Sequence, residues 1–248
     1  MKIFNFLATV SAWSVFVFFV LLFDPILRIS SLFGQKSIEK VMQIFCHCLS
    51  WSIWAGFCKL KIEGKENIPN RGGLIIVGNH QSLVESFLPF DLLYKLRPKY
   101  VAKQVLGRWI PSISFVLRNG GHCLIDRKDH ERALNSITQL GKKIDSEGIS
   151  TIIFPEGTRS LQGDLQNFKT GGLNALLEEA PQAPILIMLI HNGTKIFPKG
   201  LPRVEAGSTV TVKFLPLIER DNFNSNQEII EHIHKTMSEE YKTIQNNS

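Results

Sequence analysis

The stretch LIIVGNHQSLVES, residues 74–86, places a histidine directly behind a short apolar run. The run LIIVG is too short for a helix and is typical of a buried strand. The residues that follow it, ESFLPFDLLYKL (85–96), look helical, although Pro89 interrupts them. In α/β proteins the reactive groups gather where strands end, so His80 is a candidate functional residue.

Short apolar runs and helical stretches alternate along the rest of the chain. Further strands are predicted in KLKIEG (59–64), KYVA (99–102), CLIDR (123–127), STIIF (150–154), APILIMLI (183–190) and TVTVKFLPLI (209–218). Helices are predicted at 129–144, 172–180 and 226–244, where apolar residues recur at three- and four-residue intervals. This alternation predicts an α/β domain in which helices flank a layered central mixed sheet.

The N-terminus carries the strongest hydrophobic signal. Residues 3–23, IFNFLATVSAWSVFVFFVLLF, include no charged side chain. As a helix this segment would be about 31 Å long, enough to cross the hydrocarbon core of a bilayer. A secretory signal peptide is the alternative, but the segment is long and runs into Asp24-Pro25 without a small-x-small cleavage pattern. We therefore expect a retained membrane anchor.

A second uncharged stretch, VMQIFCHCLSWSIWAGF (41–57), is more mixed in composition. A helix in the membrane interface and a buried core helix both fit it. Between the two stretches, Arg28, Lys36 and Lys40 favour a position near anionic headgroups. We predict a hydrophobic membrane anchor of one or two helices at residues 1–57, followed by a single α/β domain at 58–248.

Charge and cysteine usage limit the partners. The 248 residues hold 28 Lys+Arg against 22 Asp+Glu, a net charge of +6, which suits an anionic membrane, phosphorylated substrates or nucleic acid. No basic block with interleaved aromatic residues occurs, so we expect no nucleic-acid partner. Cys46-His47-Cys48 lacks the spacing of a zinc site, so buried free thiols in a reducing compartment and no metal are expected.

His80 and Glu85 lie five residues apart, whereas neighbours on one helix face are separated by three or four. If a helix begins near residues 82–84, His80 lies in the preceding loop and Glu85 in the first turn. The carboxylate would then accept a hydrogen bond from Nδ1 and orient the ring as a general base. A simple helix cap at Gln81-Ser82 explains the same residues, and both interpretations stay open.

FPEGTRS (154–160) also follows a predicted strand. Gly157 permits close backbone approach, Arg159 offers a planar fork for phosphate, and Glu156 could hold that arginine or a substrate hydroxyl. Lys169 precedes a predicted helix whose free N–H groups attract anions. An ordinary surface turn with a solvated ion pair is the alternative. Asp126-Arg127, at the end of GGHCLIDR (120–127), is a weak signal alone.

Together and in this order, NHQSLVE, GGHCLIDR, FPEGTRS and APILIMLIHNG resemble the glycerolipid acyltransferase family, specifically the lysophosphatidic acid acyltransferases. Family proteins carry His-x4-Asp, Gly-x5-Arg, a Phe-Pro-Glu-Gly-Thr-Arg loop and a late proline-bearing apolar strand. The resemblance extends from about Leu60 to Leu217 and includes the hydrophobic N-terminus. FPEGTRS together with an upstream His-x4-carboxylate is specific, whereas a single block would not be.

The resemblance implies acyl transfer from acyl-CoA or acyl carrier protein to the sn-2 hydroxyl of a lysophospholipid, without a metal or other cofactor. His80 would take the hydroxyl proton, with Glu85 as its partner. Glu156, Gly157, Thr158 and Arg159 would bind the glycerol phosphate, and Arg127, Lys103 and Lys169 would add positive charge. The partners would be a lysophospholipid acceptor, the thioester donor and membrane lipids, with the domain on the cytoplasmic face of a bacterial inner membrane.

The sequence departs from the family pattern at Glu85, where Asp is usual. An acyltransferase for another lysophospholipid or for an aminolipid therefore remains an alternative. A hydrolase or thioesterase that activates water is a second one, although no Gly-x-Ser-x-Gly motif is present. A non-catalytic lipid-binding relative is the third.

Overall fold

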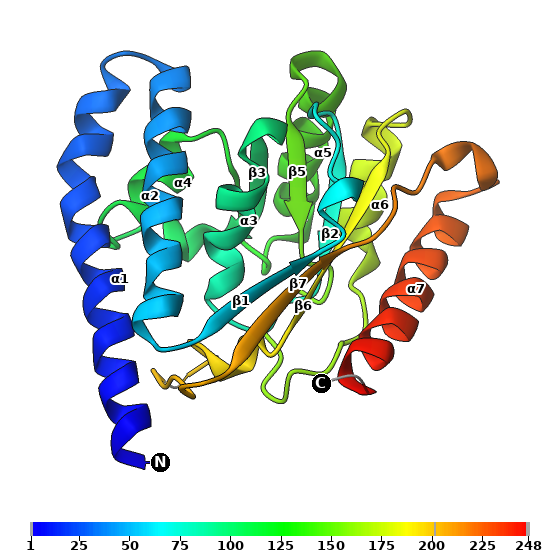
Figure 1. Ribbon diagram of the computed structural model, residues 1–248. Coiled ribbons are helices and arrows are strands. Elements are labelled where there is room, and N and C mark those ends of the chain that lie inside the picture. The colour runs from blue at the N-terminus through cyan, green and yellow to red at the C-terminus, as the bar shows by residue number, and fades with distance from the viewer. Residues whose placement is uncertain (1, 201, 247–248) are drawn as a thin grey trace.

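The computed structural model describes residues 2–200 and 202–246 (Figure 1). The strands of its seven-stranded sheet are β1 (Lys59–Glu63), β2 (Ile75–Gly78), β3 (Pro98–Lys103), β4 (Cys123–Ile125), β5 (Ser150–Ile153), β6 (Ile185–His191) and β7 (Thr209–Phe214). The α-helices are α1 (Lys2–Ser31), α2 (Gln35–Ala55), α3 (Leu88–Leu92), α4 (Ile113–Asn119), α5 (His130–Glu147), α6 (Thr170–Glu179) and α7 (Asn226–Asn246). Short 3-10 turns include η2 (Val84–Ser86), η4 (Gln104–Gly107) and η5 (Gly193–Lys195).

The strand order across the sheet is β1-β7-β6-β2-β5-β3-β4. Neighbouring strands run parallel everywhere except between β6 and β7, which are antiparallel. The five strands β6, β2, β5, β3 and β4 therefore point in the same direction and end at the same edge. The predicted mixed sheet is confirmed.

Alternate residues of the central strands enter two separate apolar cores, as the strand period of two requires. Ile76 and Ile152 pack with α1 to α4 on one face. Ile75 and Ile153 pack with α5, α6 and α7 on the other. In Figure 1, α1 and α2 stand together on one side of the sheet and α7 on the opposite side. The layered arrangement predicted from the sequence is thus present.

The long helix α1 continues beyond the predicted anchor, residues 3–23, through Pro25 to Ser31. Its buried face packs against the domain: the Phe16 ring lies 6.1 Å from Phe87 and 5.8 Å from Phe197, centroid to centroid. A three-residue connection then leads into α2. The two helices therefore form a hairpin whose inner side belongs to the same apolar core as the sheet.

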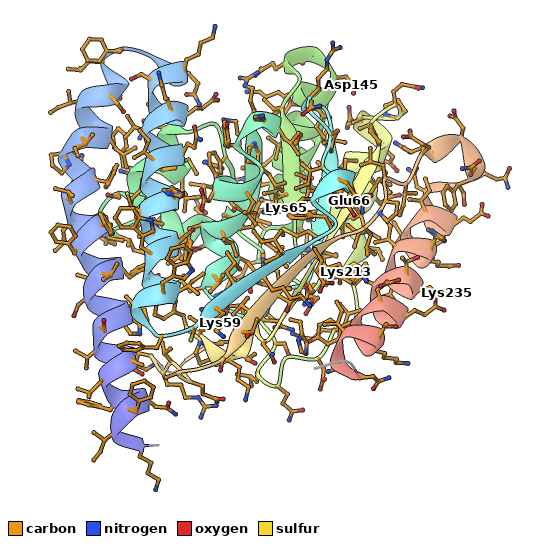
Figure 2. The ribbon with its side chains drawn as sticks, in the orientation of Figure 1. Lys59, Lys65, Glu66, Asp145, Lys213 and Lys235 are labelled. Atoms are coloured by element: carbon orange, nitrogen blue, oxygen red, sulfur yellow. The ribbon has the colours of Figure 1, made fainter. Side chains whose placement is uncertain are left out.

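The outer side of α1 is apolar and exposed. Figure 2 shows side chains composed almost wholly of carbon along it, whereas charged residues such as Lys235 project from α7. The exposed large apolar residues of α1 are Ile3, Phe4, Phe6, Leu7, Val10, Val17, Phe18, Leu21, Leu22, Ile26 and Ile29. Within residues 2–200 and 202–246, α1 is the one helix long and apolar enough to cross a membrane.

The second apolar stretch, in α2, has two faces of different character. Leu49 and Ile53 are buried in the core, whereas Trp51 and Trp54 are exposed. The core-helix interpretation therefore holds for the buried side of α2, and the interfacial interpretation stays a prediction for its exposed side.

Candidate active site

The predicted functional residues meet at one edge of the sheet because the strands that carry them are parallel. The backbone of β2 pairs with β5, β5 with β3, and β3 with β4, all in the same direction. His80 follows β2, Glu156 follows β5, and Arg127 follows β4, while Lys103 is the last residue of β3. One sheet edge therefore gathers residues that are up to 76 positions apart in sequence, as the His80–Glu156 contact illustrates.

Asn79 fixes the loop that presents His80. Its buried side-chain amide donates to the carbonyl of Ile190 at 2.8 Å and accepts from the Ile190 N–H at 2.7 Å. The amide thus occupies the position that a continued ladder between β2 and β6 would take. Because both hydrogen bonds are in the interior, the backbone immediately before His80 has little freedom.

His80 and Glu85 are in direct contact. The Nδ1 atom of His80 lies 2.9 Å from Oε2 of Glu85, which is fully buried in the first turn of η2. The Glu85 carboxylate also accepts hydrogen bonds from the N–H groups of Gln81 and Ser82, at 3.1 and 2.6 Å, and from the Ser82 hydroxyl at 3.0 Å. The loop-to-turn geometry expected from the five-residue spacing is present.

The face of the His80 ring also makes a contact. It stacks on Phe154 with centroids 4.7 Å apart and an interplanar angle of 19°. The side chain keeps 24% of its surface exposed. Since an ionised carboxylate accepts only, Nδ1 carries the proton and Nε2 is left as an acceptor. Such a ring can take a proton from a hydroxyl or from water.

The loop after β5 binds the backbone of His80 on both sides. Glu156 Oε1 accepts the His80 N–H at 2.9 Å, and the Ser160 N–H donates to the His80 carbonyl at 2.8 Å. Among the described residues Glu156 forms no ion pair with Arg159, which was one of its two expected roles. Burial raises the pKa of Glu156 to about 7, more than the N–H groups of His80 and Gln166 lower it.

Five cationic side chains gather beside this loop. Gly157 has φ +72°, and a Cβ at this residue would lie 3.2 Å from Lys169 Cδ and 3.5 Å from Arg127 Nη1. Lys103 has a lowered pKa, first because of burial and then because of the charges on Arg127, Lys199, Arg159 and Lys169. No carboxylate in residues 2–200 or 202–246 forms an ion pair with any of the five. Uncompensated positive charge of this kind favours a bound phosphate.

Lys199 belongs to this cluster although the sequence reasoning did not select it. Its Nζ donates to the Thr158 hydroxyl at 2.9 Å. Lys199 lies between β6 and β7, in a segment that also contacts the His80 loop, where the Leu83 N–H donates to the Phe197 carbonyl at 3.1 Å. The available signal was the position of FPKG (197–200) shortly after the end of a predicted strand.

Two other histidines near the sheet are buried side chains that contact the rest of the fold. The buried Nδ1 of His122 accepts the Tyr100 N–H at 3.0 Å, and burial lowers the pKa of this ring to about 3. His191 is buried against Tyr241, and burial lowers its pKa also. Neither ring is arranged to exchange a proton with a substrate.

The cysteines are free thiols, and three of them are buried. Across residues 2–200 and 202–246, no group of three or more His, Cys, Asp or Glu side chains is arranged to hold a metal ion. Cys46 is buried in the apolar core between α2 and the sheet, as the sequence predicts for an apolar thiol.

Comparison with known proteins identifies the family to which the chain belongs. The acyltransferase family profile matches residues 59–198. The chain is 31% identical over 171 residues to the 1-acyl-sn-glycerol-3-phosphate acyltransferase of Limnanthes douglasii, covering 69% of this chain and 58% of that protein. It is 32% identical over 174 residues to the enzyme of the same name from Borreliella burgdorferi, covering 69% and 66%. The chain thus aligns with less than two thirds of the length of either relative.

A solved structure has the same fold. The 1-acyl-sn-glycerophosphate acyltransferase PlsC from Thermotoga maritima superimposes with a TM-score of 0.80, covering 98% of this chain and 97% of that chain at 24% identity. The likeness therefore includes the N-terminal helices as well as the sheet. All nine site residues predicted from the sequence lie inside the segment that the family profile matches, whereas Lys199 lies just beyond it.

Proposed function

The chain belongs to the acyltransferase family, and we propose that it is a membrane-bound enzyme that acylates the sn-2 hydroxyl of lysophosphatidic acid. The donor is a fatty acyl thioester, of CoA or acyl carrier protein, and the product is phosphatidic acid for phospholipid synthesis. Relatives named 1-acyl-sn-glycerol-3-phosphate acyltransferases support this substrate. The observation that carries the proposal is the His80–Glu85 contact beside five uncompensated cations.

Proton transfer begins at His80. Nε2 takes the proton of the sn-2 hydroxyl as the oxygen attacks the thioester carbonyl. The Nδ1–H bond to Glu85, 2.9 Å long, keeps the ring in the required tautomer and stabilises the imidazolium that forms. Because Glu85 is buried and already accepts three other hydrogen bonds, it is held in place before substrate arrives.

The acceptor phosphate binds at the cationic cluster. Arg127 and Lys169 lie beside Gly157, whose lack of a side chain lets a phosphate approach the backbone, and Arg159 follows two residues later in the same loop. Thr158 adds a hydroxyl beside these charges. Glu156 acts differently from these residues, because a buried carboxyl on the His80 N–H positions the histidine rather than attracting an anion.

Collapse of the tetrahedral intermediate completes the transfer. The new C–O ester bond remains, the C–S bond breaks, and the thiolate leaves with the proton that the imidazolium returns. The oxygen of the acceptor attacks the thioester directly, so no acyl-enzyme forms. Electron pair and proton are both accounted for by donor, acceptor and His80, so the step needs no metal or other cofactor.

The exposed apolar side of α1 is the support for membrane binding. A lysophospholipid resides in a membrane, whereas thioester donors are made in the cytoplasm. We therefore place the domain on the cytoplasmic face, and in a bacterium that membrane is the inner one.

The test is product analysis with the purified full-length protein in detergent. Labelled acyl-CoA or acyl carrier protein is supplied with lysophosphatidic acid, lysophosphatidylcholine, monoacylglycerol or a lyso-aminolipid. We expect phosphatidic acid as the main product. We also expect Glu85→Asp to lower kcat without changing the preferred acceptor, because the charge is kept but the carboxylate is drawn back by one methylene.

Other products would contradict the proposal in different ways. A preference for another acceptor would retain acyl transfer but refute the substrate. Release of free fatty acid, with no acylated lipid, would identify a hydrolase. Lipid binding without turnover of either donor would identify a non-catalytic relative.

A further inference from the structure

A second basic feature lies beside the cationic cluster, at the carboxyl ends of β3 and β4. A groove of about 340 Å³ runs between the η4 turn and the loop after β4. Its charged lining consists of Lys103, Arg108, Arg127, Lys128 and a single acid, Asp126. Lys103 and Arg127 belong also to the cluster around Gly157, so the groove and the acceptor site are continuous.

The positive charge of this groove is not neutralised by neighbouring side chains. Asp126 accepts the Lys128 N–H at 3.0 Å, so its carboxylate closes a turn of the loop. Among the described residues Arg108 and Lys128 form no ion pair. Four cations against one acid leave a net charge of +3 along the groove.

The backbone of the groove wall that carries Arg108 is held by hydrogen bonds to α4. The side chain of Arg118 in α4 donates to the Gly107 carbonyl. The Ser114 hydroxyl donates to the Leu106 carbonyl and accepts the Ile110 N–H, each at 2.9 Å. These bonds tie the backbone on both sides of Arg108 to α4, so the chain that carries this side chain is held in place.

Arg108 and Lys128 are distinct from the cations of the acceptor site. Arg108 and Lys128 line the groove, whereas Arg159, Lys169 and Lys199 are not part of its lining. A single glycerol phosphate at Gly157 would therefore leave the outer groove unused. Acyl transfer needs both substrates together, so the donor must approach His80 beside the acceptor.

We propose that this groove binds the nucleotide phosphates of a coenzyme A thioester, with Arg108 and Lys128 as the residues that select the nucleotide. Separated cations along a groove suit a ligand with a diphosphate and a ribose phosphate better than one with a single phosphate. The inference rests on the proposed function and deepens it, because it assigns the donor its own site and identifies CoA as the donor for which that site is built.

The first test compares Arg108→Ala/Lys128→Ala with a control that removes the same charges elsewhere, Arg71→Ala/Lys142→Ala. We expect the first variant to raise the KM for acyl-CoA at least tenfold while the KM for lysophosphatidic acid stays unchanged. The control should resemble wild type. Acyl-phosphopantetheine, which lacks the nucleotide, should react equally well with all three proteins.

Three results would overturn the assignment. An unchanged KM for acyl-CoA in Arg108→Ala/Lys128→Ala would show that the nucleotide does not bind in the groove. A rise in the KM for lysophosphatidic acid instead would assign the groove to the acceptor. A defect confined to acyl carrier protein would make it a docking surface for that protein.

Binding of adenosine 3′,5′-bisphosphate to the full-length protein tests the groove without turnover. We expect calorimetric binding to wild type and to the control, loss of binding in Arg108→Ala/Lys128→Ala, and competition with acyl-CoA. If the wild type acylates no lipid but binds this nucleotide, and Arg108→Ala/Lys128→Ala abolishes that binding, the nucleotide site in the groove would be supported and the proposed function refuted. Acyl transfer from CoA with no binding of this nucleotide would refute the groove alone.

Discussion

At the residue scale, the site depends on the number of independent contacts that fix His80. Its Nδ1 contacts Glu85, its ring stacks on Phe154, and its backbone is bound by Glu156 and Ser160. A side chain fixed in this way loses little entropy when a ligand binds beside it. Interior hydrogen bonds of this kind are also the ones that sequence patterns reveal least well.

Glu156 gives a residue-scale prediction about pH. Burial raises its pKa from about 4.5 to about 7. Between these values the folded protein holds a proton that the unfolded chain has released, so the free energy of unfolding decreases as the pH rises through this window. The loss is at most about 3.5 kcal/mol, from about 1.4 kcal/mol per unit of pKa shift.

Glu156→Gln should remove this dependence, since glutamine still accepts the His80 N–H but does not ionise. Thermal unfolding at pH 5, 6, 7 and 8 should show a smaller decrease in Tm for the variant than for wild type. Glu178→Gln, an exposed substitution on α6, is the control and should follow wild type. Parallel curves for Glu156→Gln and wild type would show that Glu156 is ionised throughout.

At the element scale, the segment between β6 and β7 joins the cationic cluster beside Gly157 to the N-terminal helix. The Val204 N–H donates to Thr9 Oγ1 at 2.9 Å, and the Trp13 ring packs edge-on against Phe197 with centroids 4.8 Å apart. Lys199 lies between these two attachments to α1 and reaches Thr158. One cation of this cluster is thus carried by a segment that is attached to a helix almost 190 residues away in sequence.

Lys199→Ala should therefore weaken acceptor binding. We expect the KM for lysophosphatidic acid to rise about tenfold, since a hydrogen bond to a charged group contributes about 1.5–3 kcal/mol and this one is partly exposed. The KM for monoacylglycerol, which has no phosphate, should not change. Lys195→Ala is the matched control, because Lys195 lies in the same segment but pairs with Glu205 at 2.6 Å. Equal effects on both acceptors would place Lys199 outside the phosphate site.

Strand ends were predictable because buried strands are short apolar runs and polar residues follow them directly. That signal located His80, Arg127 and Glu156. It missed Lys199, since seven residues separate Lys199 from the end of β6 and only the folded segment returns it to Thr158. The hydrogen bond between Glu156 and the His80 N–H was equally hidden, because a backbone partner leaves no trace in side-chain spacing.

At the scale of the whole molecule, the sheet and the hairpin of α1 and α2 form a continuous apolar structure. Ala8, Ala12 and Phe16 are buried on the inner face of α1, and its outer face is exposed and apolar. On the far side, Lys213 of β7, which is labelled in Figure 2, pairs with Glu240 of α7 at 2.7 Å. The molecule is thus apolar on the α1 side and charged on the α7 side, as expected for a protein that contacts a membrane through one side.

Charges on the outer face of α1 should weaken membrane binding. Phe18→Lys/Leu21→Lys should reduce co-sedimentation with phosphatidylglycerol vesicles, because both side chains are more than half exposed on that face, at 58% and 57%. Leu134→Lys/Leu161→Lys, at exposed residues outside the hairpin, is the control and should sediment as wild type does. Since neither pair is buried, Tm should change little. Undiminished sedimentation of the α1 variant would place the membrane contact elsewhere.

The most direct measurement of the central claim is the initial rate of phosphatidic acid formation by wild type and by His80→Ala, with Tm measured on the same samples. We expect a decrease in kcat of about 10²- to 10⁴-fold in His80→Ala. We expect only a small change in Tm, because Glu85 keeps its hydrogen bonds from Gln81 and Ser82. Phosphatidic acid formed by folded His80→Ala at the wild-type rate would contradict the assignment of His80 as the base.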